Sequence, residues 1–447
     1  MLSSRLNPRL AKELRDRLGW NLAFKLVTYT RSTLWVVPFL SIVLVMIVGP
    51  LLKLIDGWLG WRFTGLGLAG AQALCDTVIT LSLSFMVFTF GSLLVAIQVA
   101  SGQLTPRVIA TTLLRDNVVR YSVGVFVFTL VFTVMVLDRL EQQLYGLVVF
   151  VVAGLGIGCI ATFLFLIDYA ARLLRPVSIL TRVGESGLHG IKEVYPEPAA
   201  HVARPHEPAV PPTGPSRTVL HAGASGIVLA VERDTLIDLA LRADGVIECL
   251  PHAGDFIASG EPIFKLYGGA FALDDASVQE AIAFGAERTM EQDPLFAFRI
   301  LVDIALKALS PAINDPTTAV LAIDQLNYLL RAVGKRRLRL EWLDDHTGTH
   351  RVIYRTPNWE DFVDVACTEI RACGATSVQV MRRLRAMLND LIETLPSHRH
   401  APLLAELRRL DWTIERNFPH AEDAAMARIA DSQGLGTSGA ASNRPTP

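Results

Sequence analysis

The sequence predicts a multi-pass α-helical membrane protein with four transmembrane helices, followed by an α+β cytoplasmic region. The 447-residue chain is 51% hydrophobic and 19% charged, whereas about a quarter of an ordinary soluble domain is charged. The apolar excess lies in the first 170 residues. Residues 1–175 carry 15 Lys and Arg against 8 Asp and Glu, and the remainder carries 27 against 35. An acidic soluble half does not favour nucleic acid as a partner.

Residues 1–32 form the first predicted segment, a basic cytoplasmic or interfacial helix. Leu10, Leu14, Leu18 and Leu22 recur at every fourth position among basic residues. This pattern is typical of a helix that lies on the inner leaflet of a membrane. It suits an ordinary cytosolic helix packed on the protein equally well.

Residues 33–170 form the predicted transmembrane domain. Each span can cross about 30 Å of hydrocarbon at 1.5 Å per residue. Basic residues cluster before the first span, between the second and third, and after the fourth. The positive-inside rule then places both termini in the cytoplasm. The predicted spans are Thr33–Leu52, Thr77–Ala100, Val118–Leu137 and Leu144–Ile167.

The second span carries a stripe of small and polar residues on one helical face. Close helix packing explains such a stripe, because small side chains let backbones approach. A water-lined path through a homo-oligomer also explains it, because hydroxyls can line a pore. No acid, Lys, Arg or His lies well inside a span, which argues against a buried proton relay. The stripe residues are Thr77, Thr80, Ser84, Gly91 and Gln98.

Residues 171–217 are predicted to contain the end of a cytoplasmic helix and a proline-rich linker. Residues 218–268 then form a small β module with glycine-rich turns. The stretch Gly254–Phe264 is similar to the paired turn of biotinyl and lipoyl barrel sandwiches. Since no lysine occupies a matching modification turn, the sequence does not support a carrier function.

Residues 269–432 are predicted to form a helical domain that contains a β-hairpin. Asp293-Pro294, Asp315-Pro316 and Thr356-Pro357 each resemble a helix start, with a capping residue before a first-turn proline. The hairpin joins Arg337–Leu343 to His350–Tyr354. Residues 433–447 are rich in Gly, Ser and Pro, and we expect them to be disordered.

In addition to the stripe of the second span, a group of polar residues lies where one predicted helix stops at Ser310-Pro311 and the next begins at Asp315-Pro316. A turn that caps its own helices accounts for this group. A ligand or ion site at a helix terminus is the alternative. The residues concerned are Ser310, Asn314, Asp315, Thr317 and Thr318.

The sequence provides no candidate catalytic, cofactor-binding or metal-ligating residues. The five cysteines are scattered and lack C-x-x-C spacing. His346 and His350 flank a glycine-containing turn, where their spacing does not bring them to one face as it would in a helix. We find none of the common phosphate-loop, serine-hydrolase or zinc-protease motifs. We therefore expect no enzyme activity and no cofactor.

Three segments resemble a known family. They are Ile97–Arg107 after the second span, Arg288–Pro294 in a predicted helix together with Val302–Ala319, and Pro357–Asp361. These look like the domain-of-unknown-function 2254 family of predicted bacterial membrane proteins. The resemblance extends from the first span to about residue 430. It implies a protein of the bacterial inner membrane and supplies no catalytic residues.

Two functions remain open at this point. The first is an oligomeric channel or transport-related protein in which a cytoplasmic domain senses or gates. The second is a scaffold or sensor that transports nothing and binds a cytoplasmic partner. In both cases we expect the lipid bilayer as surroundings, a homo-oligomer, and a cytoplasmic protein or small ligand as partner.

Overall fold

The computed structural model describes residues 36–59, 67–103, 117–140, 146–173, 175–198, 211–338 and 342–435. The predicted helix within residues 1–32 lies outside these ranges, as do residues 436–447 of the predicted disordered tail. The chain divides into two compact units, with the boundary between Ile179 and Leu180. We describe each unit by itself and call them the membrane unit and, after the location that the sequence predicts for it, the cytoplasmic unit.

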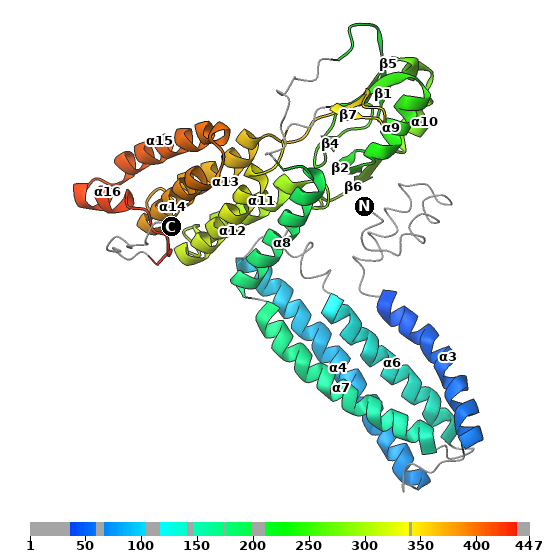
Figure 1. Cartoon of the computed structure of the whole chain (residues 1–447). Coiled ribbons are helices and arrows are strands. Elements are labelled where there is room, and N and C mark those ends of the chain that lie inside the picture. The colour runs from blue at the N-terminus through cyan, green and yellow to red at the C-terminus, as the bar shows by residue number, and fades with distance from the viewer. Residues whose placement is uncertain are drawn as a thin grey trace. The chain divides into compact units, whose positions relative to one another are not determined.

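The described residues of the membrane unit form four long helices that lie side by side (Figure 1). They are α3 (Val36–Leu59), α4 (Leu68–Gln103), α6 (Asn117–Leu140) and α7 (Gly146–Leu173). Within the described residues, α4, α6 and α7 are long and apolar enough to cross a membrane. The apolar part of α3, Val36–Leu52, is shorter than a full span. The structure therefore supports three of the four predicted spans by length and composition.

Helix α6 makes the most extensive contacts in this unit, since it packs against α3, α4 and α7. Close approach to α3 occurs at Gly124, where an added Cβ would lie 2.6 Å from a methyl group of Val37. Between α4 and α7 the ring of Phe85 stacks on that of Phe163, with 4.2 Å between centroids. Aromatic stacking and a small residue thus contribute to the packing of the bundle.

Helix α8 (Pro176–Val194) occupies much of the segment predicted to be a helix end and linker. Its residues Gly184, Gly187 and Gly190 recur every three positions and are all buried. An added Cβ at Gly187 would lie 2.7 Å from the Cβ of Ala297, and one at Gly190 would lie 2.9 Å from the carbonyl oxygen of Met290. The glycines therefore let α8 lie directly on α11 (Pro294–Ala308) and α12 (Pro316–Gly334).

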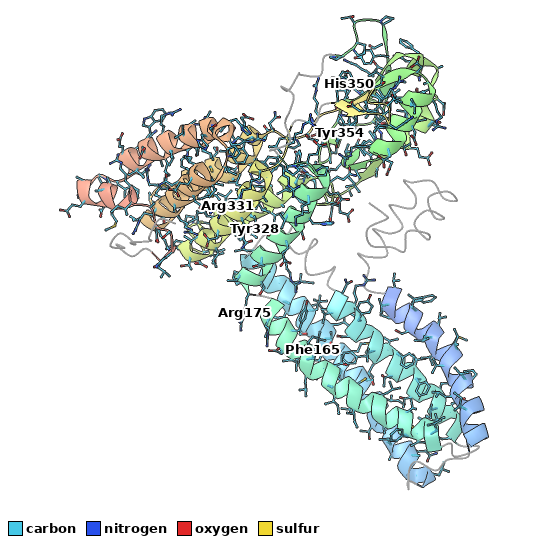
Figure 2. The ribbon with its side chains drawn as sticks, viewed as in Figure 1. Phe165, Arg175, Tyr328, Arg331, His350 and Tyr354 are labelled. Atoms are coloured by element: carbon cyan, nitrogen blue, oxygen red, sulfur yellow. The ribbon has the colours of Figure 1, made fainter. Side chains whose placement is uncertain are left out.

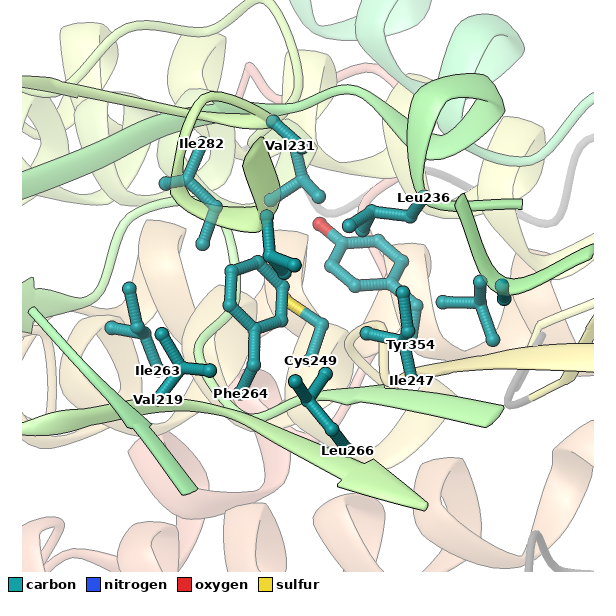
Figure 3. Packing of buried hydrophobic residues seen from close by; sticks show 14 of the residues in the cluster. Val219, Val231, Leu236, Ile247, Cys249, Ile263, Phe264, Leu266, Ile282 and Tyr354 are labelled. Atoms are coloured by element: carbon teal, nitrogen blue, oxygen red, sulfur yellow. The ribbon is translucent and has the colours of Figure 1, made fainter. Parts of the chain in front are cut away.

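Two sheets form the β-rich part of the cytoplasmic unit. The order is β1-β5-β3-β8-β7 in the larger sheet and β4-β2-β6 in the smaller. Figure 3 shows the apolar core of this part, in which Phe264, Leu266 and Ile247 are fully buried. The predicted barrel-sandwich-like architecture is not confirmed. The strands are β1 (Ser216–Leu220), β2 (Gly226–Val231), β3 (Gly245–Cys249), β4 (Phe256–Ile257), β5 (Pro262–Gly268), β6 (Ile282–Gly285), β7 (Trp342–Asp344) and β8 (His350–Tyr354).

The predicted hairpin forms, but it does not belong to the helical domain. Strands β7 and β8 pair antiparallel, and β8 also pairs in parallel with β3, with Ile247 opposite Val352. His350 and Tyr354 mark the two ends of β8 (Figure 2). The hairpin thus completes the sheet that begins with β1, about 130 residues earlier in the chain. Alternating hydrophobicity predicts a strand but does not say with which strand it pairs.

Helix α9 (Arg233–Arg242) lies between β2 and β3 in the chain, and α10 (Asp275–Gln279) precedes β6. The helical part of the cytoplasmic unit adds four helices to α11 and α12. α12 packs on α14, and α15 packs on both α13 and α14. Tyr328 and Arg331 lie on α12 (Figure 2). The four added helices are α13 (Trp359–Cys373), α14 (Val378–Thr394), α15 (His400–Asn417) and α16 (Ala421–Ala427).

Two of the three predicted helix starts are confirmed. The side chain of Asp293 accepts a hydrogen bond from the backbone N–H of Phe296 at the start of α11, and Asp315 caps α12 in the same way. The third helix begins two residues later than predicted from Thr356-Pro357. Asn358 caps α13 in a capping box with Asp361, while residues 288–293, predicted to be helical, precede α11 in irregular structure.

The predicted disordered tail begins at residue 433, but residues 433–435 are described, and Gln433 and Gly434 are hydrogen-bonded. The side chain of Asp431 accepts from the N–H groups of Gln433 and Gly434, and Gln379 donates to the carbonyl of Gly434. Arg383 donates to the carbonyls of Asp431 and Ser432. Side chains of α14 therefore hold the chain to this point.

The glycine face of α8 predicts a specific sensitivity to side-chain size. Gly187→Leu should lower the free energy of unfolding of the cytoplasmic unit by about 1–3 kcal/mol, because overpacking outweighs the gain in helix propensity. Thermal unfolding of the full-length protein in detergent measures the change. Glu185→Leu places the same side chain on the exposed face of α8 and should change little. Equal stabilities of the two variants would contradict the close packing.

Candidate functional site

The predicted polar stripe lies on the outer surface of the membrane unit. All five residues, Thr77, Thr80, Ser84, Gly91 and Gln98, are exposed. The hydroxyls of Thr77 and Thr80 donate to the carbonyls one turn earlier, at 2.7 and 2.8 Å. An added Cβ at Gly91 would meet open space. The described helices of this chain therefore leave the stripe uncovered.

Packing within the chain uses another face of α4, which the sequence analysis did not single out. Its buried residues recur at steps of three, four and seven, and this spacing was visible in the sequence. Buried hydroxyls also occur on α6, at Ser122, Thr129 and Thr133. The stripe therefore takes no part in the packing between the described helices of the membrane unit. The buried α4 residues are Ala71, Cys75, Val78, Ser82, Thr89 and Ala96.

The polar residues between α11 and α12 form a compact capped turn. Ser310 donates to the carbonyl of Lys307 at 2.6 Å. Asp315 accepts from both the N–H and the hydroxyl of Thr318. Asn314 has a φ of 49°, which asparagine tolerates better than most residues, and Thr317 is exposed. These bonds serve the helix ends, and among them we find no side chain directed at a ligand.

An open pocket of about 600 Å³ lies in the β-rich part of the cytoplasmic unit. The ring of His221 is buried and stacks on Phe284, with 4.1 Å between centroids. Its Nε2 forms a hydrogen bond with the carbonyl of Ala224. Ser225, Gln279 and Glu280 supply the other polar side chains of the lining, which contains no Lys or Arg. The pocket suits a neutral or cationic small molecule better than a phosphate.

A buried carboxylate lies where the β-rich and helical parts of the cytoplasmic unit meet. One oxygen of Asp293 caps α11, and the other lies 3.1 Å from Nη2 of Arg288. Gly254, with a φ of 98°, lies against both groups, and an added Cβ there would collide with them. The next residue, Asp255, accepts from the N–H of His252 at 2.8 Å. The turn that carries Gly254 thus packs directly on the start of α11.

Burial dominates the electrostatics of Asp293. It raises the pKa of this carboxyl to about 6, although Arg288 and the N–H of Phe296 both act to lower it. Asp255 adds to the increase by repulsion. Hydrogen bonds from His252 lower the pKa of Asp255 itself. The two neighbouring acids therefore differ in charge over the weakly acidic pH range.

Metal binding has no support in the part of the chain that the structure describes. No group of three or more His, Cys, Asp or Glu side chains there could hold an ion. His350 pairs instead with Asp344, and its ring stacks on Trp342 at 5.0 Å between centroids. The other histidine of this turn, His346, is exposed.

The buried position of Asp293 predicts a pH dependence of stability. Its folded pKa is about 6, above the usual 3.8. The folded state therefore holds the proton longer than the unfolded state, and the free energy of unfolding should fall as pH rises from about 4 to about 6. The loss should not exceed roughly 3 kcal/mol, at about 1.4 kcal/mol per pKa unit.

Denaturant unfolding of the full-length protein across this pH range measures the effect. Asp293→Asn keeps a capping oxygen and should flatten this part of the profile. An unchanged slope in that variant would assign the pH dependence to other groups.

The chain is similar to an uncharacterized protein of Mycobacterium bovis and to two of Mycobacterium tuberculosis, each 24% identical over 419 residues. The aligned region covers 90% of this chain and 80% of each relative. No solved structure matches. Residues 31–390 match the family DUF2254, described as predicted membrane proteins, and the chain therefore belongs to that family.

Proposed function

We propose that this chain is the subunit of a homo-oligomeric channel or transport-related protein of the bacterial inner membrane, in which the polar stripe of α4 lines the path. The observation that carries the proposal is the exposure of all five stripe residues on the outside of the membrane unit. Hydrocarbon is a poor environment for such a face, since small and polar residues in membrane helices pack against protein or line water.

The cytoplasmic unit suits a sensing or gating role in this proposal. Helix α8 begins three residues after α7 ends, and its glycine face packs on α11 and α12. A ligand in the 600 Å³ pocket beside His221 and Phe284 would bind to the same compact unit. Movement of the cytoplasmic unit would then be transmitted to the membrane helices through the short connection between α7 and α8.

A scaffold or sensor that transports nothing is the second candidate, and one observation favours it. The hydroxyls of Thr77 and Thr80 are already bonded to their own helix. Because these hydroxyls already have hydrogen-bond acceptors, they do not need water as a partner. The stripe would therefore also serve as a dry interface between copies of the chain. The two candidates differ in whether the stripe lines water.

Conductance measurements distinguish them. Reconstituted in planar bilayers, the full-length protein should give discrete current steps. Ser84→Trp should abolish these steps by obstructing the path, whereas Leu83→Trp should preserve them, because Leu83 is an exposed apolar residue away from the stripe. The oligomer size of all three proteins is measured in parallel by light scattering.

Silence of the unsubstituted protein across several salts and both voltage signs would overturn the channel. Loss of current together with dissociation in Ser84→Trp would instead assign the stripe to packing between copies. Equal loss of current in Ser84→Trp and Leu83→Trp at unchanged oligomer size would show that the stripe does not line the path.

The proposed orientation, with both termini in the cytoplasm, rests on the basic flanks of the spans. The cysteines allow a direct test, because Cys373 is exposed while the other four are buried. A membrane-impermeant maleimide should label Cys373 in inverted inner-membrane vesicles and not in intact spheroplasts. Cys373→Ser should remove the label. Labelling in spheroplasts would reverse the orientation.

A further inference from the structure

The membrane unit contains a pocket of about 230 Å³ that the proposed function does not use. It lies between the later turns of α4, the first turn of α6 and the later turns of α7. The lining contains no charged side chain. Its residues are Phe88, Thr89, Ser92, Leu93, Ala96, Val119, Phe163, Leu166, Ile167, Ala170 and Ala171.

The floor of this pocket is buried and its rim is exposed. Thr89 and Ala96 on the floor are 3% and 8% exposed, whereas Phe88 and Ile167 at the rim are 54% and 45% exposed. The pocket therefore opens at the outer surface of the membrane unit. At this surface the helices are apolar enough to span a bilayer, and in a bilayer they would face hydrocarbon.

The side chains of the lining offer an occupant almost no free hydrogen-bonding groups. Its two hydroxyls are already bonded within α4: Thr89 donates to the carbonyl of Phe85 at 2.7 Å, and Ser92 donates to that of Thr89 at 3.0 Å. The remaining side chains are aliphatic or aromatic. A polar ligand would lose its hydration here without replacement, whereas hydrocarbon would gain contacts.

The position of the pocket on α4 separates it from the polar stripe. At 3.6 residues per turn, Thr89, Leu93 and Ala96 on the floor lie roughly 160° around the helix axis from the stripe, whereas Phe88 at the rim lies roughly 60° from it. A second copy that covered the stripe would therefore reach the rim at Phe88 but not the floor of the pocket. This argument holds whether the stripe lines a channel or a dry interface.

We propose that this pocket is a binding site for an acyl chain of a membrane lipid. The chain enters past Phe88 and Ile167 and lies against Ala96 and Leu166. Small residues at Ala96, Ala170 and Ala171 leave the space, and the edge-on rings of Phe88 and Phe163, 5.3 Å apart, form one wall.

Photo-crosslinking in vesicles tests the proposal on the full-length protein. The vesicles contain phosphatidylethanolamine and phosphatidylglycerol, with a trace of a phospholipid that carries a diazirine on one acyl chain. After irradiation, peptide mass spectrometry should find label concentrated on the pocket residues, in excess of the label on exposed residues such as Leu94 and Leu164.

Variants that fill the pocket provide the control. Ala96→Trp occupies the floor, and Ala171→Trp occupies the exposed rim, where folding is not at risk. Both should reduce pocket labelling to the level of other exposed residues. Leu94→Trp adds a large ring to α4 outside the pocket and should leave the labelling unchanged.

Even labelling of all exposed faces would overturn the proposal. So would pocket labelling that persists in Ala171→Trp and in a folded Ala96→Trp. If Ala96→Trp fails to fold, Ala171→Trp alone decides the result.

Discussion

The close approach of α8 to α11 and α12 joins the helix that follows the membrane spans to the helical part of the cytoplasmic unit. Gly184, Gly187 and Gly190 remove three side chains from one face, so the helix axes approach more closely than larger residues would allow. At the end of α8, the hydroxyl of Tyr195 donates to the carbonyl of Pro357, just before α13. Its ring packs edge-on against Phe362 of the same helix. Residues of α8 and the segment that follows it thus contact α11, α12 and α13.

The start of α11 extends this arrangement to the β-rich part. Asp293 caps the helix with one carboxylate oxygen and holds Arg288 with the other, while Gly254 brings the β3–β4 turn against both. Because the carboxyl is buried beside an arginine, packing and electrostatics at this junction depend on the same few atoms. A change in its protonation would act on both parts of the cytoplasmic unit at once, which suits a unit proposed to sense or gate.

In the membrane unit, three faces of α4 meet three different environments. The buried face of α4 packs on α6 and α7, the polar stripe faces out of the chain, and the pocket beside Phe88 opens toward hydrocarbon. Hydroxyls on all three faces bond to their own backbone, as at Thr77, Thr89 and Ser92. Polar composition alone therefore does not reveal which face meets water, and the arrangement around the helix axis has to supply that information.

The sequence by itself determined the local features: apolar stretches at α4, α6 and α7, the caps at Asp293 and Asp315, and the β7–β8 hairpin. Each depends on residues close together in the chain, so periodicity and capping chemistry are sufficient to predict it. Only the tertiary structure decided that β8 pairs with β3, that Gly254 meets Arg288, and that the α4 stripe remains uncovered. These contacts join residues far apart in the chain, or concern which of several amphipathic faces is buried, and one sequence does not contain a local signal for either.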